Sequence, residues 1–128
     1  MTEIHGDITV STEGNLLLVV AHGAFNLEGT RRAYAAIEAA AAPLLTRPWF
    51  KLTDFRDCML GGPDCLELIS RHNQWCVTHN CLAMALVVEN AVVRDIYRAR
   101  TAASGLPLTI HTSVDEARQQ VLAVLASR

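Results

Sequence analysis

The sequence predicts an α/β fold: a mixed sheet of about five strands with four helices, in the order β-β-α-β-α-β-α-β-α. Short β-prone runs alternate with segments whose apolar residues recur at helical spacing. Strand-helix-strand connections of this length are right-handed crossovers, which place helices on both faces of a sheet. At 128 residues the chain has the size of one domain with one core, so residues 1–128 are interpreted as a single domain.

Two β-prone runs, Asp7–Ser11 and Leu16–His22, open the chain, and the turn-forming residues between them predict a hairpin. Asn26 is a good N-cap for the amphipathic helix that follows. Its inward residues are expected to be Leu27, Thr30, Tyr34, Ile37, Ala41 and Leu44. Pro43 lies inside this pattern, so the helix should end just before it or kink there.

A buried strand, Trp49–Thr53, comes next and is followed by a polar loop that extends to Gly62. Pro63 then suits the first turn of a second helix, which should run to about His79. Asn80 can take the left-handed conformation that ends a helix. After it, the nearly unbroken apolar run Leu82–Val88 is typical of a strand buried on both faces of a parallel sheet.

Asn90 is expected to cap a third helix, and Leu108–His111 forms a short final strand. A capping box, Ser113 to Glu116, begins the last helix. The apolar stripe of the third helix is expected to be Val92, Ile96, Ala99 and Ala103. In the last helix the inward residues are expected to be Ala117, Val121 and Val124.

Composition excludes several classes of partner. A formal net charge of −2 and scattered arginines give no electrostatic footprint for nucleic acid. No apolar run approaches the roughly 20 residues of a membrane span, and no export signal opens the chain, so a soluble cytoplasmic protein is expected. The four cysteines show no C-x-x-C pair and are interpreted as reduced thiols.

The element order and the segment GAFNLEGTRRAYAAIEAAAAPLLTRPWFKLTDFRD resemble the bacterial STAS-like family. That family groups anti-sigma-factor-antagonist-like domains with the CRAL-TRIO lipid-binding fold. The resemblance extends from about Ile8 to Leu125, and its recognisable points are Gly23 with Phe25, Pro48-Trp49 and Asp54-x-Arg56. It implies a STAS-like fold and a regulatory or protein-interaction role.

This chain departs from the family at one functional position. The true antagonists of the family are phosphorylated on a serine at the start of the helix after the third strand. Here residues 57–64 read Asp-Cys-Met-Leu-Gly-Gly-Pro-Asp, with no hydroxyl. The phosphoserine switch is therefore not carried over.

Polar residues gather where the central strand is predicted to end. Parallel strands end at one edge of a sheet, and the connections after two neighbouring strands frame a groove there. The candidate residues for binding a ligand or a partner are Asp54, Arg56, Asp57, Cys58, Glu89 and Asn90. The alternative is a local ion pair with turn caps. If the groups are solvated, alanine at Asp54, Arg56 or Asp57 should cost less than about 1 kcal/mol.

The second helix carries Cys65, His72, Cys76 and His79 within one arc. Four side chains spread along about four turns cannot reach one ion, so His72, Cys76 and His79 are only weak metal candidates, and core packing is favoured. No cofactor is implied. Cys58, the one thiol predicted in a loop, has no histidine near it in sequence, so no catalytic residue is assigned.

These observations favour a non-enzymatic regulatory or protein-interaction domain. The alternative is a small-molecule or lipid-binding module of CRAL-TRIO type, because apolar helices flank a sheet with a polar rim. An enzyme is the third class, and it rests only on Cys58 and the His-Cys arc. The expected partner is an unidentified protein or a small apolar ligand, and the sequence leaves homodimer formation open.

Overall fold

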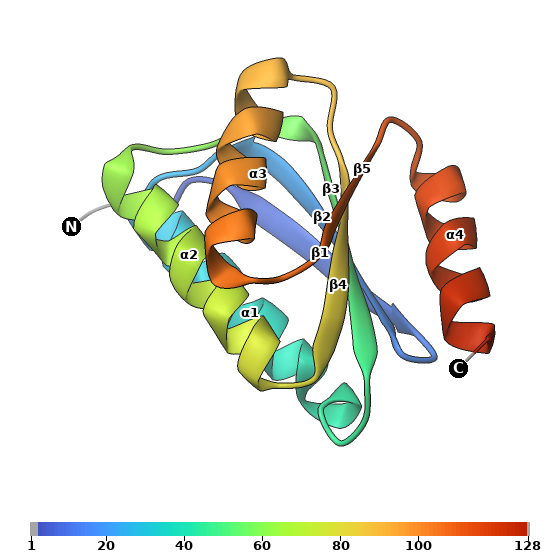
Figure 1. The fold of residues 1–128 in the computed structure, drawn as a ribbon. Coiled ribbons are helices and arrows are strands. Elements are labelled where there is room, and N and C mark those ends of the chain that lie inside the picture. Colours follow the sequence, from blue (N-terminus) through green and yellow to red (C-terminus); the bar gives the residue numbers. More distant parts are fainter. Residues whose placement is uncertain (1–2, 128) are drawn as a thin grey trace.

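A computed structural model describes residues 3–127 and contains a five-stranded sheet covered by helices on both faces (Figure 1). The strands are β1 (Asp7–Glu13), β2 (Leu16–Ala24), β3 (Trp49–Met59), β4 (Cys81–Val87) and β5 (Leu108–His111). The helices are α1 (Leu27–Ala41), α2 (Pro63–Thr78), α3 (Ala91–Ser104) and α4 (Val114–Ala126), with a 3-10 turn η1 (Ala42–Leu44) after α1. The predicted element order and the mixed sheet are confirmed.

The sheet follows the chain, in the order β1-β2-β3-β4-β5. β1 and β2 form the predicted antiparallel hairpin, from the pair Asp7 and His22 to the pair Glu13 and Leu16. The pairs β2–β3, β3–β4 and β4–β5 are parallel. The carboxyl ends of β2 to β5 therefore meet at one edge of the sheet, which we call the carboxyl edge.

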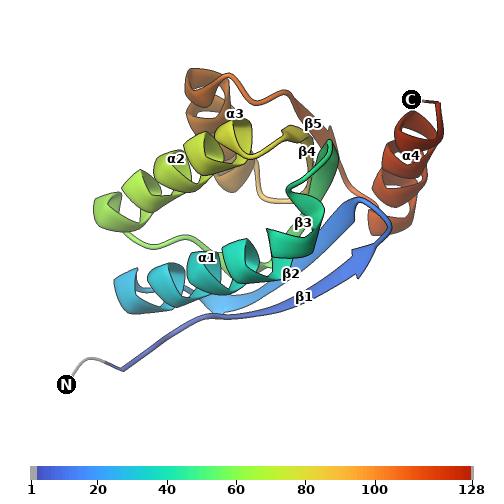
Figure 2. The same cartoon turned by 90° about the horizontal axis from the view of Figure 1, so that it is seen from below.

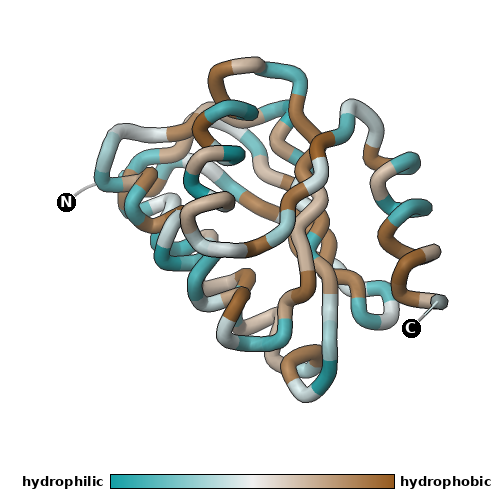
Figure 3. Tube along the Cα trace, viewed as in Figure 1, coloured by the Kyte–Doolittle hydropathy of each residue, from teal (hydrophilic) through white to brown (hydrophobic). Residues whose placement is uncertain are grey.

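Each face of the sheet has its own core layer. Helices α1, α2 and α3 cover one face and α4 alone covers the other (Figures 1 and 2). The three-helix side buries Trp49, Met84 and Tyr97, whereas the α4 side buries Leu52 and Val121. Apolar segments follow the central strands in Figure 3, and apolar and polar residues alternate along the helices. None of the helices within residues 3–127 has the length and hydropathy that a membrane crossing requires.

The predicted helix caps are confirmed. The side-chain oxygens of Asn26, Asn90 and Ser113 accept hydrogen bonds from backbone N–H groups in the first turns of α1, α3 and α4. Helix α1 ends at Ala41, before Pro43, as the proline requires. Asn80 takes the expected left-handed conformation, with φ of 70°.

Two predicted helix faces need correction. In α3 the buried residues are Val93, Tyr97 and Thr101. The predicted stripe of Val92, Ile96, Ala99 and Ala103 is wrong, because the helix is rotated so that the large Tyr97 ring enters the core and Val92 is 68% exposed. In α4, Ala117 and Val121 are buried as predicted. Val124 is exposed, since the last turns pack through Leu122 and Leu125 instead.

Candidate functional site

The central strand is longer than the sequence indicates. It continues to Met59, so Asp54, Arg56, Asp57 and Cys58 belong to β3 and not to a loop. The reason is that β2 also continues, to Ala24, and supplies backbone partners for these polar residues. The pairing advances two residues on β2, from Val20 to His22, while it advances three on β3, from Asp54 to Asp57. This extra residue is a β-bulge, a feature that re-aims side chains near strand ends.

Asp54 and Arg56 form a tight ion pair across the bulge. The Arg56 backbone N–H donates to Asp54 Oδ1 at 3.1 Å, and the guanidinium donates to both carboxylate oxygens at 3.0 and 2.9 Å. Burial alone would raise the pKa of Asp54, but the hydrogen bonds and charge of Arg56 outweigh it and lower that pKa below its ordinary value. Asp54 is 7% exposed, so the condition under which its replacement by alanine was expected to cost less than about 1 kcal/mol does not hold.

The other predicted residues lie around this pair. Asp57 lies 3.5 Å from the ring of His22 and is almost fully exposed. Glu89 follows the end of β4, and its charge contributes, after the larger effect of Asp54, to the raised pKa of Arg56. The Asn90 side chain accepts from the N–H groups of Val92 and Val93, so its oxygen is occupied in capping α3.

Cys58 has the environment of an unreactive thiol. Its Sγ lies 3.8 Å from the carbonyl oxygen of Phe55. Burial, followed by the charges of Asp54 and Asp57, raises the pKa of the thiol to about 12. The thiol is therefore protonated at neutral pH, and this site lacks the activated nucleophile that covalent catalysis needs.

The carboxyl edge also exposes large apolar side chains. Met59, the last residue of β3, is 67% exposed, and Val92, in the first turn of α3, is 68% exposed. An open hollow of about 310 Å³ lies beside Met59 and is lined by Arg56, Asp57 and Cys58 together with the end of β2. Apolar and charged groups mixed on an open surface are typical of protein docking sites.

The His-Cys arc of α2 faces the core. His72 is 2% exposed; its Nδ1 lies 3.0 Å from a carboxylate oxygen of Glu38, and its Nε2 lies 3.4 Å from the sulfur of Cys76. Burial, helped by the charge of Lys51, lowers the pKa of His72 well below its ordinary value. His79 lies elsewhere, with Nδ1 2.7 Å from the carbonyl oxygen of Trp75. Within residues 3–127, His, Cys, Asp and Glu side chains form no group of three placed to hold a metal ion.

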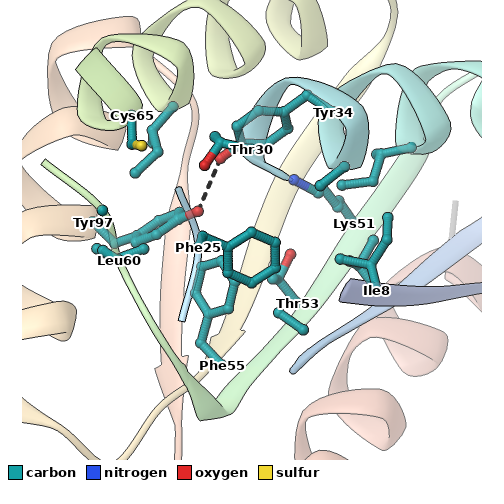
Figure 4. Close-up of a pocket in the computed structure, with 16 residues that line it drawn as sticks. Ile8, Phe25, Thr30, Tyr34, Lys51, Thr53, Phe55, Leu60, Cys65 and Tyr97 are labelled. Atoms are coloured by element: carbon teal, nitrogen blue, oxygen red, sulfur yellow. Dashed lines mark hydrogen bonds between the residues drawn. The ribbon is translucent and has the colours of Figure 1, made fainter. Parts of the chain in front are cut away.

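The structure contains a cavity between the three-helix layer and the sheet, a feature that the sequence left undecided (Figure 4). Strands β1 to β3 form its floor, and α1, α2 and α3 contribute to its walls. Most of its lining is apolar, but Lys51 and the hydroxyls of Tyr34 and Tyr97 border it. The sequence does hold a signal for this site, since Lys51 is the only lysine in the chain and stands in the middle of the apolar run Trp49–Thr53.

The fold places the protein among α/β domains of SpoIIAA-like architecture. The structure is similar to that of an anti-sigma factor antagonist from Mycobacterium paratuberculosis, with a TM-score of 0.65, 16% identity, and coverage of 91% of this chain and 93% of that one. It is equally similar, at a TM-score of 0.65 and 14% identity, to an uncharacterized DUF3478 family protein with a SpoIIAA-like fold from Shewanella loihica, covering 94% of this chain and 97% of that one. The resemblance to a STAS-like fold is confirmed. No protein-family model matches the sequence, and no curated protein matches it.

Proposed function

We propose that this protein is a non-enzymatic regulatory domain that binds a protein partner through the carboxyl edge of its sheet. The observation that carries the proposal is the exposure of Met59 and Val92 at the same edge as the charged residues Arg56, Asp57 and Glu89. Exposed apolar side chains rimmed by charges bury apolar area on docking, while the charges select the partner. The fold shared with an anti-sigma factor antagonist adds support for this class of function.

In this proposal, binding is not controlled by phosphorylation at the start of α2. Helix α2 begins at Pro63, and its N-cap, Gly62, has no side chain to cap the helix. Thr53 and Ser70 are the nearest hydroxyl residues on either side in sequence. Thr53 is buried in β3, and Ser70 lies in the middle of α2. Neither residue therefore occupies the position of a phosphoacceptor at the helix start.

A cytoplasmic location belongs to the same proposal. The four cysteines are free, and three of them are buried. Reducing compartments maintain thiols in this state. The sequence leaves homodimer formation open, in which case the partner is a second copy of this chain. Sedimentation of the purified protein tests this case.

The test uses the full chain as immobilised bait in lysate of its source organism, followed by titration of any recovered protein after purification. We expect Met59→Asp or Val92→Asp to weaken binding of that protein by about tenfold or more, since each places a charge in a desolvated apolar contact. Val124→Asp is the matched control. Val124 is also a partly exposed valine, 45% accessible, but it lies on α4, away from α3.

Equal binding losses in Val124→Asp and in the two edge variants would contradict the proposed location. Recovery of no specific protein, together with reproducible catalytic turnover by the purified chain, would contradict the proposed class. Sedimentation of the purified protein over a concentration series separates self-association from binding of a different protein.

The cavity supports a second candidate function, the binding of a small molecule. Its volume is about 40 Å³, and its walls are mostly apolar with a few polar groups, as in small-molecule sites generally. This volume favours a small ligand over a lipid. Native mass spectrometry of gently purified protein tests this candidate, and a ligand-free mass together with no response to any small amphiphile would contradict it.

A further inference from the structure

The only lysine of the chain is buried in the centre of the sheet. Ten of the eleven basic residues are arginines, and the exception, Lys51, is 2% exposed. It lies on β3 between Leu17 of β2 and Met84 of β4. Taking an ammonium group out of water is costly unless an anion or hydrogen-bond acceptors replace the water. A lysine at this position therefore calls for a partner.

No such partner is present within residues 3–127. Lys51 forms neither a hydrogen bond nor an ion pair with any of these residues, and its amine lies 5.6 Å from the centroid of the Tyr34 ring. The carboxylate of Glu38, which could neutralise the amine, is bonded to His72 instead. Figure 4 shows the amine pointing toward α1 at the border of the cavity.

Two phenols supply a further hydrogen-bond donor at the same cavity. The hydroxyl oxygens of Tyr34 and Tyr97 lie 3.0 Å apart, and one of the two hydroxyls donates to the other. The second hydrogen of the pair then remains for a ligand. Burial raises the pKa of both phenols above the ordinary value, so both hydroxyls keep their protons at neutral pH. The Lys51 amine, which forms no ion pair within residues 3–127, and an O–H donor form a site for a negatively charged oxygen.

The size of the cavity limits the anion. A volume of about 40 Å³ holds roughly three or four groups of the size of water. The remaining walls are mostly apolar and carry no second cation. The two hydroxyls among them, on Thr30 and Thr53, already donate to the Asn26 carbonyl and to the Met84 sulfur. A phosphate dianion would leave a charge uncompensated there, and such a charge is strongly disfavoured. A single carboxylate with a short hydrocarbon body satisfies both limits.

We propose that this cavity binds a small monocarboxylic acid, with the carboxylate held by the Lys51 amine and the Tyr34–Tyr97 hydroxyl pair and the hydrocarbon chain held by the apolar walls. This inference rests on the second candidate function, because it requires that the cavity is a ligand site. It is independent of the docking surface at the carboxyl edge.

Protonation of Lys51 reports on the ligand. Burial lowers the pKa of the Lys51 amine, an effect that nearby acidic groups oppose in part. The titratable groups around it are Tyr34 and Glu38 on α1, His72 and Cys76 on α2, and Cys81 on β4. A carboxylate beside the amine would stabilise the ammonium form, so binding should raise the pKa of Lys51.

The experiment is NMR of the full chain grown with ¹³C,¹⁵N-lysine. Because the chain has one lysine, its side-chain signals need no assignment. Sodium acetate, whose four heavy atoms match the cavity volume, is the probe, and acetamide, of the same shape but uncharged, is its control. We expect acetate to shift the Lys51 ε-carbon signal saturably, to raise the apparent pKa of Lys51, and to bind about tenfold or more tightly than acetamide, as one charge-assisted hydrogen bond implies.

Lys51→Met retains the length and apolar stem of the side chain and removes the amine. We expect it to weaken acetate binding, measured by calorimetry, by about tenfold or more and to leave acetamide binding unchanged. Equal binding of the two probes to the native protein overturns the carboxylate assignment while small-molecule binding stands. Binding of neither probe, with no shift of the Lys51 signals, overturns both the carboxylate assignment and the proposal that the cavity binds a small molecule. The NMR titration of the native protein decides the question even if Lys51→Met fails to fold.

Discussion

Removal of the Asp54 carboxylate should destabilise the protein, contrary to what a solvated group would do. Asp54→Ala deletes one backbone and two guanidinium hydrogen bonds, and leaves the N–H of Arg56 without its acceptor. Hydrogen bonds to charged groups contribute about 1.5–3 kcal/mol each when buried. Since the Arg56 side chain is 41% exposed, solvent screening reduces its share, and we expect a total loss of about 2 kcal/mol.

The assay is urea and thermal unfolding of the native protein, Asp54→Ala, Arg56→Ala and the double variant. A loss of about 2 kcal/mol should lower Tm by roughly 7 °C for a chain of this size. The double-mutant cycle should give a coupling of about 1 kcal/mol between the two side chains. Asp57→Ala is the control on the same strand, because the Asp57 side chain is 89% exposed and should cost less than about 0.5 kcal/mol.

The same prediction has a signature in pH. The pKa of Asp54 is lower in the folded protein than in the unfolded chain, so the unfolded chain binds the proton first as pH falls. The contribution of the pair is therefore complete above the ordinary carboxyl pKa near 4 and is lost as pH falls through the lower folded value. Equal stability of Asp54→Ala and Asp57→Ala at neutral pH, or zero coupling in the cycle, would refute the reasoning.

Two further predictions concern the packing around α1 and α2. Gly29→Ala would bring a Cβ onto the carbonyl oxygen of His5 and should lower the free energy of unfolding, measured in urea, by about 1–3 kcal/mol. Gly62→Ala has open space at its Cβ and should change that free energy by less than about 0.5 kcal/mol. Similar losses in the two variants would contradict this reasoning. The depressed pKa of buried His72 should make stability fall as pH drops below about 6.5, by up to about 1.4 kcal/mol per pH unit, and His72→Phe, which can retain the ring stacking on Tyr34, should flatten this slope. An unchanged slope in His72→Phe would assign the pH dependence to other groups.

Local interactions explain what the sequence predicted well. The caps Asn26, Asn90 and Ser113 were predictable because each side chain bonds to a backbone N–H two or three residues further on. The strand β5 was predicted with its observed bounds, Leu108–His111. The hairpin and the end of α1 before Pro43 depend on turn and proline chemistry of the same short range.

Long-range pairing explains what the sequence did not predict. Asp54 to Met59 read as a loop because the segment is polar at its start, yet β2 holds it in the sheet by partners more than 30 residues away. The buried stripe of α3 depends on where Tyr97 meets Tyr34 and Phe55, which no periodicity in α3 alone reveals. The sequence marks Lys51 as the only lysine within an apolar run, but only the assembled layers show that its amine borders a cavity.

Strand β3 carries both Lys51 and the Asp54–Arg56 ion pair, and these two groups lie on opposite faces of the sheet. Lys51 faces α1 and the cavity, whereas Asp54 contacts Arg56 in the field of Asp115 on α4. Successive side chains of a strand point to opposite faces, so the odd separation of Lys51 and Asp54 places their side chains on different faces. The two groups share no hydrogen-bond partner among residues 3–127. Substitutions at Lys51 and at Asp54 should therefore act additively on stability, and a ligand effect confined to Lys51 variants would belong to the cavity alone.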